Sequence, residues 1–225
     1  MGAGGAHLPP VRRANLIGIM TLAALGGCEM KPAETLDGPR ILAIRTTPAA
    51  LSPGESHVLE ALSFEVAGPI AWSYCRDAWQ PTEPLSCASG AVALGQGNPL
   101  TVTLPDGVES LWLRAEATDG EALPAVKLVS ADSDAQNPEV LGVTGESGAL
   151  PANVAVGAAV VVKVALGDEA SADKQVVSWY VTVGELEPAV ILASETSTWT
   201  MPAVAGAARL IAVVREKAGG TGWAE

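Results

Sequence analysis

Histidine is scarce in this chain of 225 residues, which contains only two. His57 is the one that lies beyond the extreme N-terminus, so a Ser-His-Asp site would have to be built around it. Its neighbour Ser56 would point to the opposite face of an extended strand. The sequence also has no glycine-rich phosphate loop and no His/Glu metal motif. We therefore predict that the protein is not an enzyme, and a hydrolase that uses His57 is the least favoured function.

Basic residues are also few, with 13 Lys and Arg against 25 Asp and Glu, and the net charge is −12. A chain this acidic repels nucleic acid, so nucleic-acid partners are excluded. Long hydrophobic runs are lacking as well. The longest near the N-terminus extends from Ala14 to Leu25, which is shorter than the roughly 20 residues that a membrane-spanning helix needs.

That short apolar run follows Arg12-Arg13 and ends in Leu25-Gly26-Gly27-Cys28. A basic flank, a short apolar run and small residues before a cleavage site are typical of a secretory signal. The ending resembles the lipobox of bacterial lipoproteins. The resemblance implies that residues 1–27 are a cleaved signal peptide and that Cys28 becomes the lipidated first residue. The alternatives are an ordinary signal with a chance cysteine, or a buried apolar segment.

The resemblance also implies a location. Two or three acyl chains, such as palmitate, anchor a protein stably, whereas one chain does not. Glu29 follows Cys28, where an Asp would signal inner-membrane retention in enteric lipoproteins. We therefore expect export and an outer-membrane lipid anchor, with the protein facing the periplasm or the cell surface. Arg12-Arg13 faintly resembles a twin-arginine signal, so Sec and twin-arginine export both remain open.

Cleavage before Cys28 would remove two of the 13 basic residues and none of the 25 acidic ones, which leaves a net charge of −14. It would also leave Cys75 and Cys87 as an even pair in an oxidising compartment. We predict a disulfide between them that closes a local loop. The rival interpretation, a metal site, has no nearby histidine and the wrong spacing for zinc.

Beyond the signal, apolar residues recur with a period of two, which predicts half-buried antiparallel strands at the spacing of β-sandwiches. The predicted fold class is all-β, with two sandwiches in tandem. The predicted divisions are a lipidated tether at 28–39, a first sandwich with the disulfide loop at 40–130, a linker at 131–137 and a second sandwich at 138–225.

Each predicted sandwich carries a tryptophan on a long strand, Trp72 in Ala71-Trp72-Ser73-Tyr74 and Trp179 in Ser178-Trp179-Tyr180. Both look similar to the tryptophan that an immunoglobulin-like sandwich buries between its sheets. Together with the lipobox, the pattern resembles uncharacterised bacterial lipoproteins with tandem immunoglobulin-like domains. The predicted disulfide differs from that of antibody domains, because it closes a local loop rather than linking two sheets. The resemblance implies an architecture and no activity.

Asp132, Asp134 and Asn137 in the linker supply hard oxygen ligands, so we consider a calcium site there. The arrangement partly resembles the calcium-binding linkers of cadherins. The alternative is a polar linker in which Asp and Asn form local turns and no cofactor is bound.

Trp112 and Trp199 fall on strand positions that we expect to face outward, where they could bind a ligand or partner. Packing under a neighbouring loop is the alternative that we prefer. The leading function is a non-catalytic structural or protein-interaction module of the bacterial cell envelope, anchored by its lipid and contacting another envelope protein. The alternative is a module that binds envelope or extracellular carbohydrate. The oligomeric state stays open.

Overall fold

The computed structural model describes residues 35–225 apart from 53, 83–84 and 132–133. These residues belong to one compact unit, Pro32–Glu225. The predicted signal peptide, the predicted lipidation site Cys28 and the predicted calcium ligand Asp132 therefore lie outside the described residues. Among the described residues, no helix is long and apolar enough to cross a membrane.

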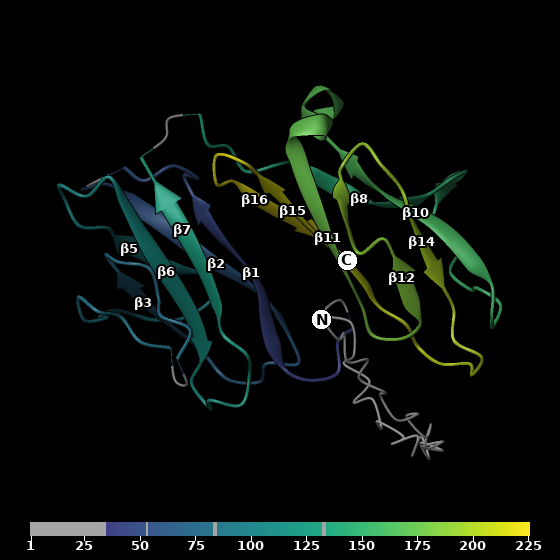
Figure 1. Ribbon diagram of the computed structural model, residues 1–225, viewed down its shortest axis with the longest axis horizontal. Helices are drawn as coiled ribbons and strands as arrows, with labels where there is room; N and C mark the ends of the chain where they lie inside the picture. The colour runs from purple at the N-terminus through teal and green to yellow at the C-terminus, as the bar shows by residue number, and fades with distance from the viewer. Residues whose placement is uncertain (1–34, 53, 83–84, 132–133) are drawn as a thin grey trace, which may run out of the picture. The chain divides into compact units, whose positions relative to one another are not determined.

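The described residues form an almost entirely β structure, as predicted (Figure 1). The strands of the first half are β1 (Arg40–Thr47), β2 (Ser56–Phe64), β3 (Ile70–Cys75), β4 (Val92–Gln96), β5 (Leu100–Thr103), β6 (Ser110–Ala117) and β7 (Ala125–Ser130). Those of the second half are β8 (Val140–Gly145), β9 (Gly148–Ala149), β10 (Ala159–Leu166), β11 (Gln175–Val181), β12 (Glu185–Glu187), β13 (Val190–Leu192), β14 (Ser197–Thr200), β15 (Leu210–Glu216) and β16 (Thr221–Ala224). A six-residue 3₁₀ helix, η1 (Glu169–Lys174), precedes β11.

The strands pair antiparallel in four sheets within the described part of the chain. Their strand orders are β1-β2-β5, β4-β3-β6-β7, β13-β11-β15-β16 and β12-β14-β10-β8-β9. The first two sheets come from the first half of the chain and the last two from the second half, so each half contributes a pair of sheets.

The first half buries a hydrophobic cluster drawn from both of its sheets. Alternate residues of β6 (Leu111, Leu113 and Ala115) pack in it with Leu59 of β2 and Trp72 of β3. Trp72 is 1% exposed and its indole Nε1 donates a hydrogen bond to Gly97 O at 2.7 Å. Trp72 thus lies in the core, as predicted.

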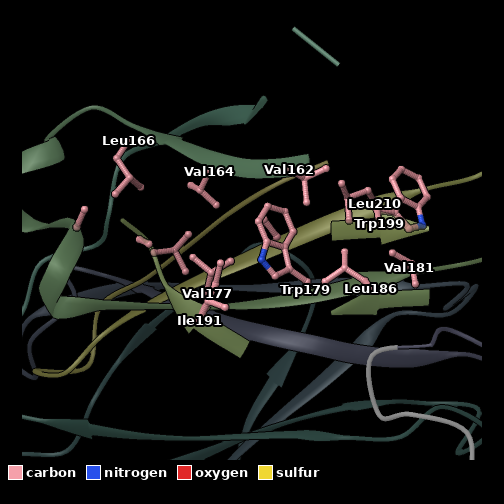
Figure 2. Close-up of a cluster of buried hydrophobic side chains, with 14 of the residues drawn as sticks. Val162, Val164, Leu166, Val177, Trp179, Val181, Leu186, Ile191, Trp199 and Leu210 are labelled. Atoms are coloured by element: carbon pink, nitrogen blue, oxygen red, sulfur yellow. The ribbon is translucent and has the colours of Figure 1, made fainter. Parts of the chain in front are cut away.

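The second half has its own cluster, in which Trp179 of β11 is 1% exposed. Figure 2 shows Trp179 surrounded by Val162, Val177 and Leu186. Residues at every second position of β11 and β10 face this cluster, so the period-two pattern predicts the buried faces of these strands correctly. Trp179 also lies in a core, as predicted.

A third hydrophobic cluster joins the two halves. Its buried members come from residue 36, β1, β2 and β15: Leu36, Leu42, Ala43, Leu62, Phe64, Ile211 and Val213, with Tyr180 and Trp223 packed against them. Sheet β1-β2-β5 and sheet β13-β11-β15-β16 are therefore apolar on both faces. In β1 a register shift between Ile41 and Ala43 places Leu42 and Ala43 in this cluster while Ile41 and Ile44 face the first core.

The connecting segments are packed rather than free. Residues 35–39 were predicted to belong to a flexible tether, but Leu36 is buried in the third cluster and its N–H donates to Val181 O at 2.7 Å. In the linker, Gln136 O lies where a side chain on Gly220 would project, so this position admits only glycine. Leu36 is packed rather than exposed because both its side chain and its backbone N–H have partners in the second half.

Cys75 and Cys87 lie at disulfide distance, with their Cα atoms 5.9 Å apart. The pair closes a loop after β3, and Gln80 N donates to Ser86 O at 2.8 Å within it. The placement agrees with the local loop staple predicted from the cysteine count.

We predict that Ile211→Ala lowers the free energy of unfolding of the whole described unit by about 2–5 kcal/mol. Ile211 is 0% exposed and belongs to the cluster between the halves. Loss of its methyl groups leaves a cavity there, so both halves should lose stability together. Urea unfolding followed by tryptophan fluorescence and far-ultraviolet circular dichroism measures this.

Val190→Ala is the matched control, since Val190 is also aliphatic but 62% exposed, and it should change stability by no more than about 0.5 kcal/mol. Two separate unfolding transitions, of which Ile211→Ala moves only one, would contradict the prediction.

Candidate functional site

Trp112 lies on the outer face of the sheet β4-β3-β6-β7, as its strand position predicts. It alternates with buried Leu111 and Leu113 and is itself half-buried. The indole Nε1 of Trp79 donates to Trp112 O at 3.4 Å, and the guanidinium of Arg114 lies 5.2 Å from the ring centroid of Trp79. The disulfide loop thus brings a second aromatic ring beside Trp112.

Trp199 was expected to face outward, and this orientation is wrong. It is 7% exposed, belongs to the second core, and donates from Nε1 to Val183 O at 3.0 Å. The alternation in β14 is real, but Ser197 and Trp199 are the residues that face inward. Trp199 also lines a pocket of about 850 Å³ together with Leu150, Met201 and Arg209.

The linker places Asn137 in a bridging position. Its Nδ2 donates to Thr46 O at 2.8 Å and its Oδ1 accepts from Thr221 N at 3.0 Å, which links β1 of the first half to β16 of the second. The side-chain oxygen that a calcium ion would need is therefore engaged with the backbone. Asp134 and Asn137 both line a pocket of about 450 Å³, and Asp132 is not described.

Within the described residues, no group of three or more His, Cys, Asp and Glu side chains is arranged to hold a metal ion. His57 is fully buried in β2, and its Nε2 lies 3.2 Å from both the N and the O of Ser52. It pairs in register with Val102 of β5. Its ring is packed inside the first half, so the structure does not bring it to a surface where a substrate could bind.

A cationic cluster that the sequence did not reveal lies where the two halves meet. Arg215 of β15 donates from Nη1 to Ser178 Oγ at 2.9 Å and from Nη2 to Leu42 O at 3.2 Å, which spans the two halves. Arg45 of β1 covers the ring of Trp223 at 4.3 Å from its centroid. The same Arg45 donates from Nε to Glu60 Oε2 at 2.8 Å.

Lys127 of β7 completes this cluster. Its Nζ is buried and has no hydrogen-bond partner among the described residues. Burial, and then the charges of Arg215 and Arg45, lower the pKa of Lys127 from 10.5 to about 8. Burying an ammonium without a counter-charge is unfavourable, and nearby like charges add to the cost. Lys127 therefore carries an unfavourably buried positive charge at the junction of the two halves.

The sequence contains one signal for the buried junction, though not for its charges. Leu210-Ile211-Ala212-Val213-Val214 is a continuous apolar run that ends in Arg215, and such runs are typical of strands buried on both faces. Nothing in the local sequence around Lys127 places it beside Arg215, because that contact depends on how the two halves pack.

With this geometry in view, comparison with known proteins adds no identification. The sequence matches no protein-family profile and no curated protein.

We predict that Lys127→Met stabilises the protein at neutral pH, by up to about 3 kcal/mol, because it removes a buried charge whose pKa is lowered from 10.5 to about 8. Between pH 8 and 10.5 the unfolded chain keeps a proton on Lys127 that the folded chain has released. Wild-type stability therefore rises across that window relative to the variant. Urea unfolding at pH 7, 8.5 and 10 in chloride, without phosphate or carboxylate buffers, measures the difference.

Lys163→Met serves as the control, because Lys163 is an exposed lysine on β10. It should show no such trend with pH. A Lys127→Met variant whose stability relative to wild type is the same at all three pH values would contradict the prediction.

Proposed function

We propose that the protein is an exported lipoprotein of the bacterial outer membrane that acts as a non-catalytic structural or protein-interaction module. In this proposal Cys28 carries the lipid and two immunoglobulin-like sandwiches form one stiff body beyond it. The observation that carries the proposal is the third hydrophobic cluster, which packs the two halves against each other through residues such as Phe64 and Ile211. A stiff body suits a protein that presents a fixed surface to a partner.

The point at which the chain enters the folded unit supports the same proposal. Leu36 is buried and hydrogen bonded to Val181, so a lipid on Cys28 would be joined to the body by the short segment before Thr35. At about 3.5 Å per extended residue, that segment reaches no more than roughly 25 Å. The anchor would therefore hold the body close to the membrane rather than on a long stalk.

Trp72 and Trp179 support the immunoglobulin-like assignment, because each is a nearly fully buried tryptophan in the core of its half. The loop closed by Cys75 and Cys87 is not part of the immunoglobulin-like pattern. Carbohydrate binding is the second candidate. Trp112 with Trp79 is the observation that favours it, and the burial of Trp199 removes one of the two tryptophans on which it was based.

Cys28→Ser tests the anchor. In a Gram-negative host, the wild-type chain should be processed and recovered in the outer-membrane fraction, whereas Cys28→Ser should stay unprocessed or leave that fraction. The double variant Cys75→Ser/Cys87→Ser is the matched control, because it removes two cysteines and keeps Cys28; it should fractionate like wild type. Unchanged processing and fractionation of Cys28→Ser would refute lipid anchoring.

Cross-linking in intact cells tests the interaction role with the same strains. The wild-type chain should capture a specific envelope protein, and Cys28→Ser should capture less of it because the chain is no longer held at the membrane. Recovery of no specific partner from correctly localised wild-type protein would count against an interaction module.

A further inference from the structure

A small pocket opens beside the cationic cluster at the junction of the halves. Its volume is about 260 Å³, and its walls come from β1, β7 and the β15–β16 hairpin. Lys127 and Arg215 line it together with Leu42, Ile44, Gly220 and Thr221. A water molecule occupies about 30 Å³ of liquid, so the pocket has room for a small ligand or for one end of a larger one.

Three charged residues line this pocket, the cations Lys127 and Arg215 and the carboxylate Glu216. Nζ of Lys127 has three donors and no partner among the described residues. The guanidinium of Arg215 is held in place by Ser178 and Leu42, so it needs no movement to present its charge. Of the carboxylates near the two cations, Glu216 lines the pocket and its Oε2 accepts from Gln136 N at 3.0 Å, while Glu60 accepts from Arg45.

This arrangement is unusual in a chain whose net charge is −12. A buried ammonium without a partner is a cost that folding would avoid unless the group has a use. An anion in the pocket would supply the missing acceptor and offset the repulsion between Lys127 and its neighbouring guanidiniums. The lowered pKa of Lys127 agrees with this picture, since an anionic ligand would stabilise the charged form and raise that pKa again.

We propose that this pocket binds a small oxyanion, a phosphate or carboxylate group, with Lys127 donating hydrogen bonds to it and Arg215 providing a second, fixed positive charge. Lysine and arginine are the side chains that bind such groups through charge-assisted hydrogen bonds. The proposal does not depend on the lipid anchor or on the interaction role, because it rests on the junction alone.

Isothermal titration of the purified full chain with inorganic phosphate and, separately, with acetate tests the proposal at constant ionic strength in chloride. Wild type should bind at least one of the two saturably, in the millimolar range or below, and its unfolding midpoint should rise with that anion. Binding of phosphate alone identifies a phosphoryl ligand, and binding of acetate alone identifies a carboxylate ligand.

Lys127→Met should weaken that binding by about tenfold or more, as expected when a hydrogen bond to a charged group is lost. Lys163→Met should bind like wild type, and Lys127→Arg should keep most of the affinity because it keeps the charge. Cooperative unfolding of Lys127→Met shows that the loss is local; if this variant does not fold, Lys127→Gln replaces it. Absence of saturable binding of either anion to wild type, or equal affinity in Lys127→Met and wild type, would overturn the proposal.

Discussion

The apolar contact between the sheets β1-β2-β5 and β13-β11-β15-β16 is the constraint on which the rest of this molecule depends. Sandwiches in tandem usually bury one face of each sheet and leave the other to water. Here Leu42, Phe64, Ile211 and Val213 put apolar side chains on the second face as well. Exposing such a surface is unfavourable, so the two halves associate and each inner sheet is covered on both sides.

Polar groups at the margin of this contact set how the halves meet. Asn137 bonds to the backbone of β1 and β16, and Arg215 reaches from β15 to the backbone of β1. The same packing explains why the charge of Lys127 is unfavourably buried. Once the halves come together, this lysine from β7 is enclosed beside two guanidiniums, a position that a chain with independent domains would not force upon it. The packing of the two halves therefore accounts both for the stiff body and for the unfavourable clustering of cations beside the pocket.

Strand alternation made much of the fold predictable, including the burial of Trp72 and Trp179, and the cysteine count predicted that Cys75 and Cys87 lie at disulfide distance. It failed at Trp199, because alternation identifies two faces of a strand and does not say which one is covered. It also treated residues 35–39 as free tether, since a single apolar side chain such as Leu36 in a Pro- and Gly-containing segment carries no periodic signal. The cationic junction could not be predicted, because Arg45, Lys127 and Arg215 are brought together only by packing between distant segments. The continuous apolar run of β15 was the one local sign that a second face is buried.

Hydrogen exchange of the backbone amides of β1, β2, β11 and β15 tests the union of the halves most directly. If the third cluster joins them into one cooperative unit, the slowest amides of both halves should exchange only through global unfolding, with one common free energy of opening equal to that from urea unfolding. A distinctly lower free energy of opening for the slowest amides of one half, while those of the other stay protected, would contradict this account.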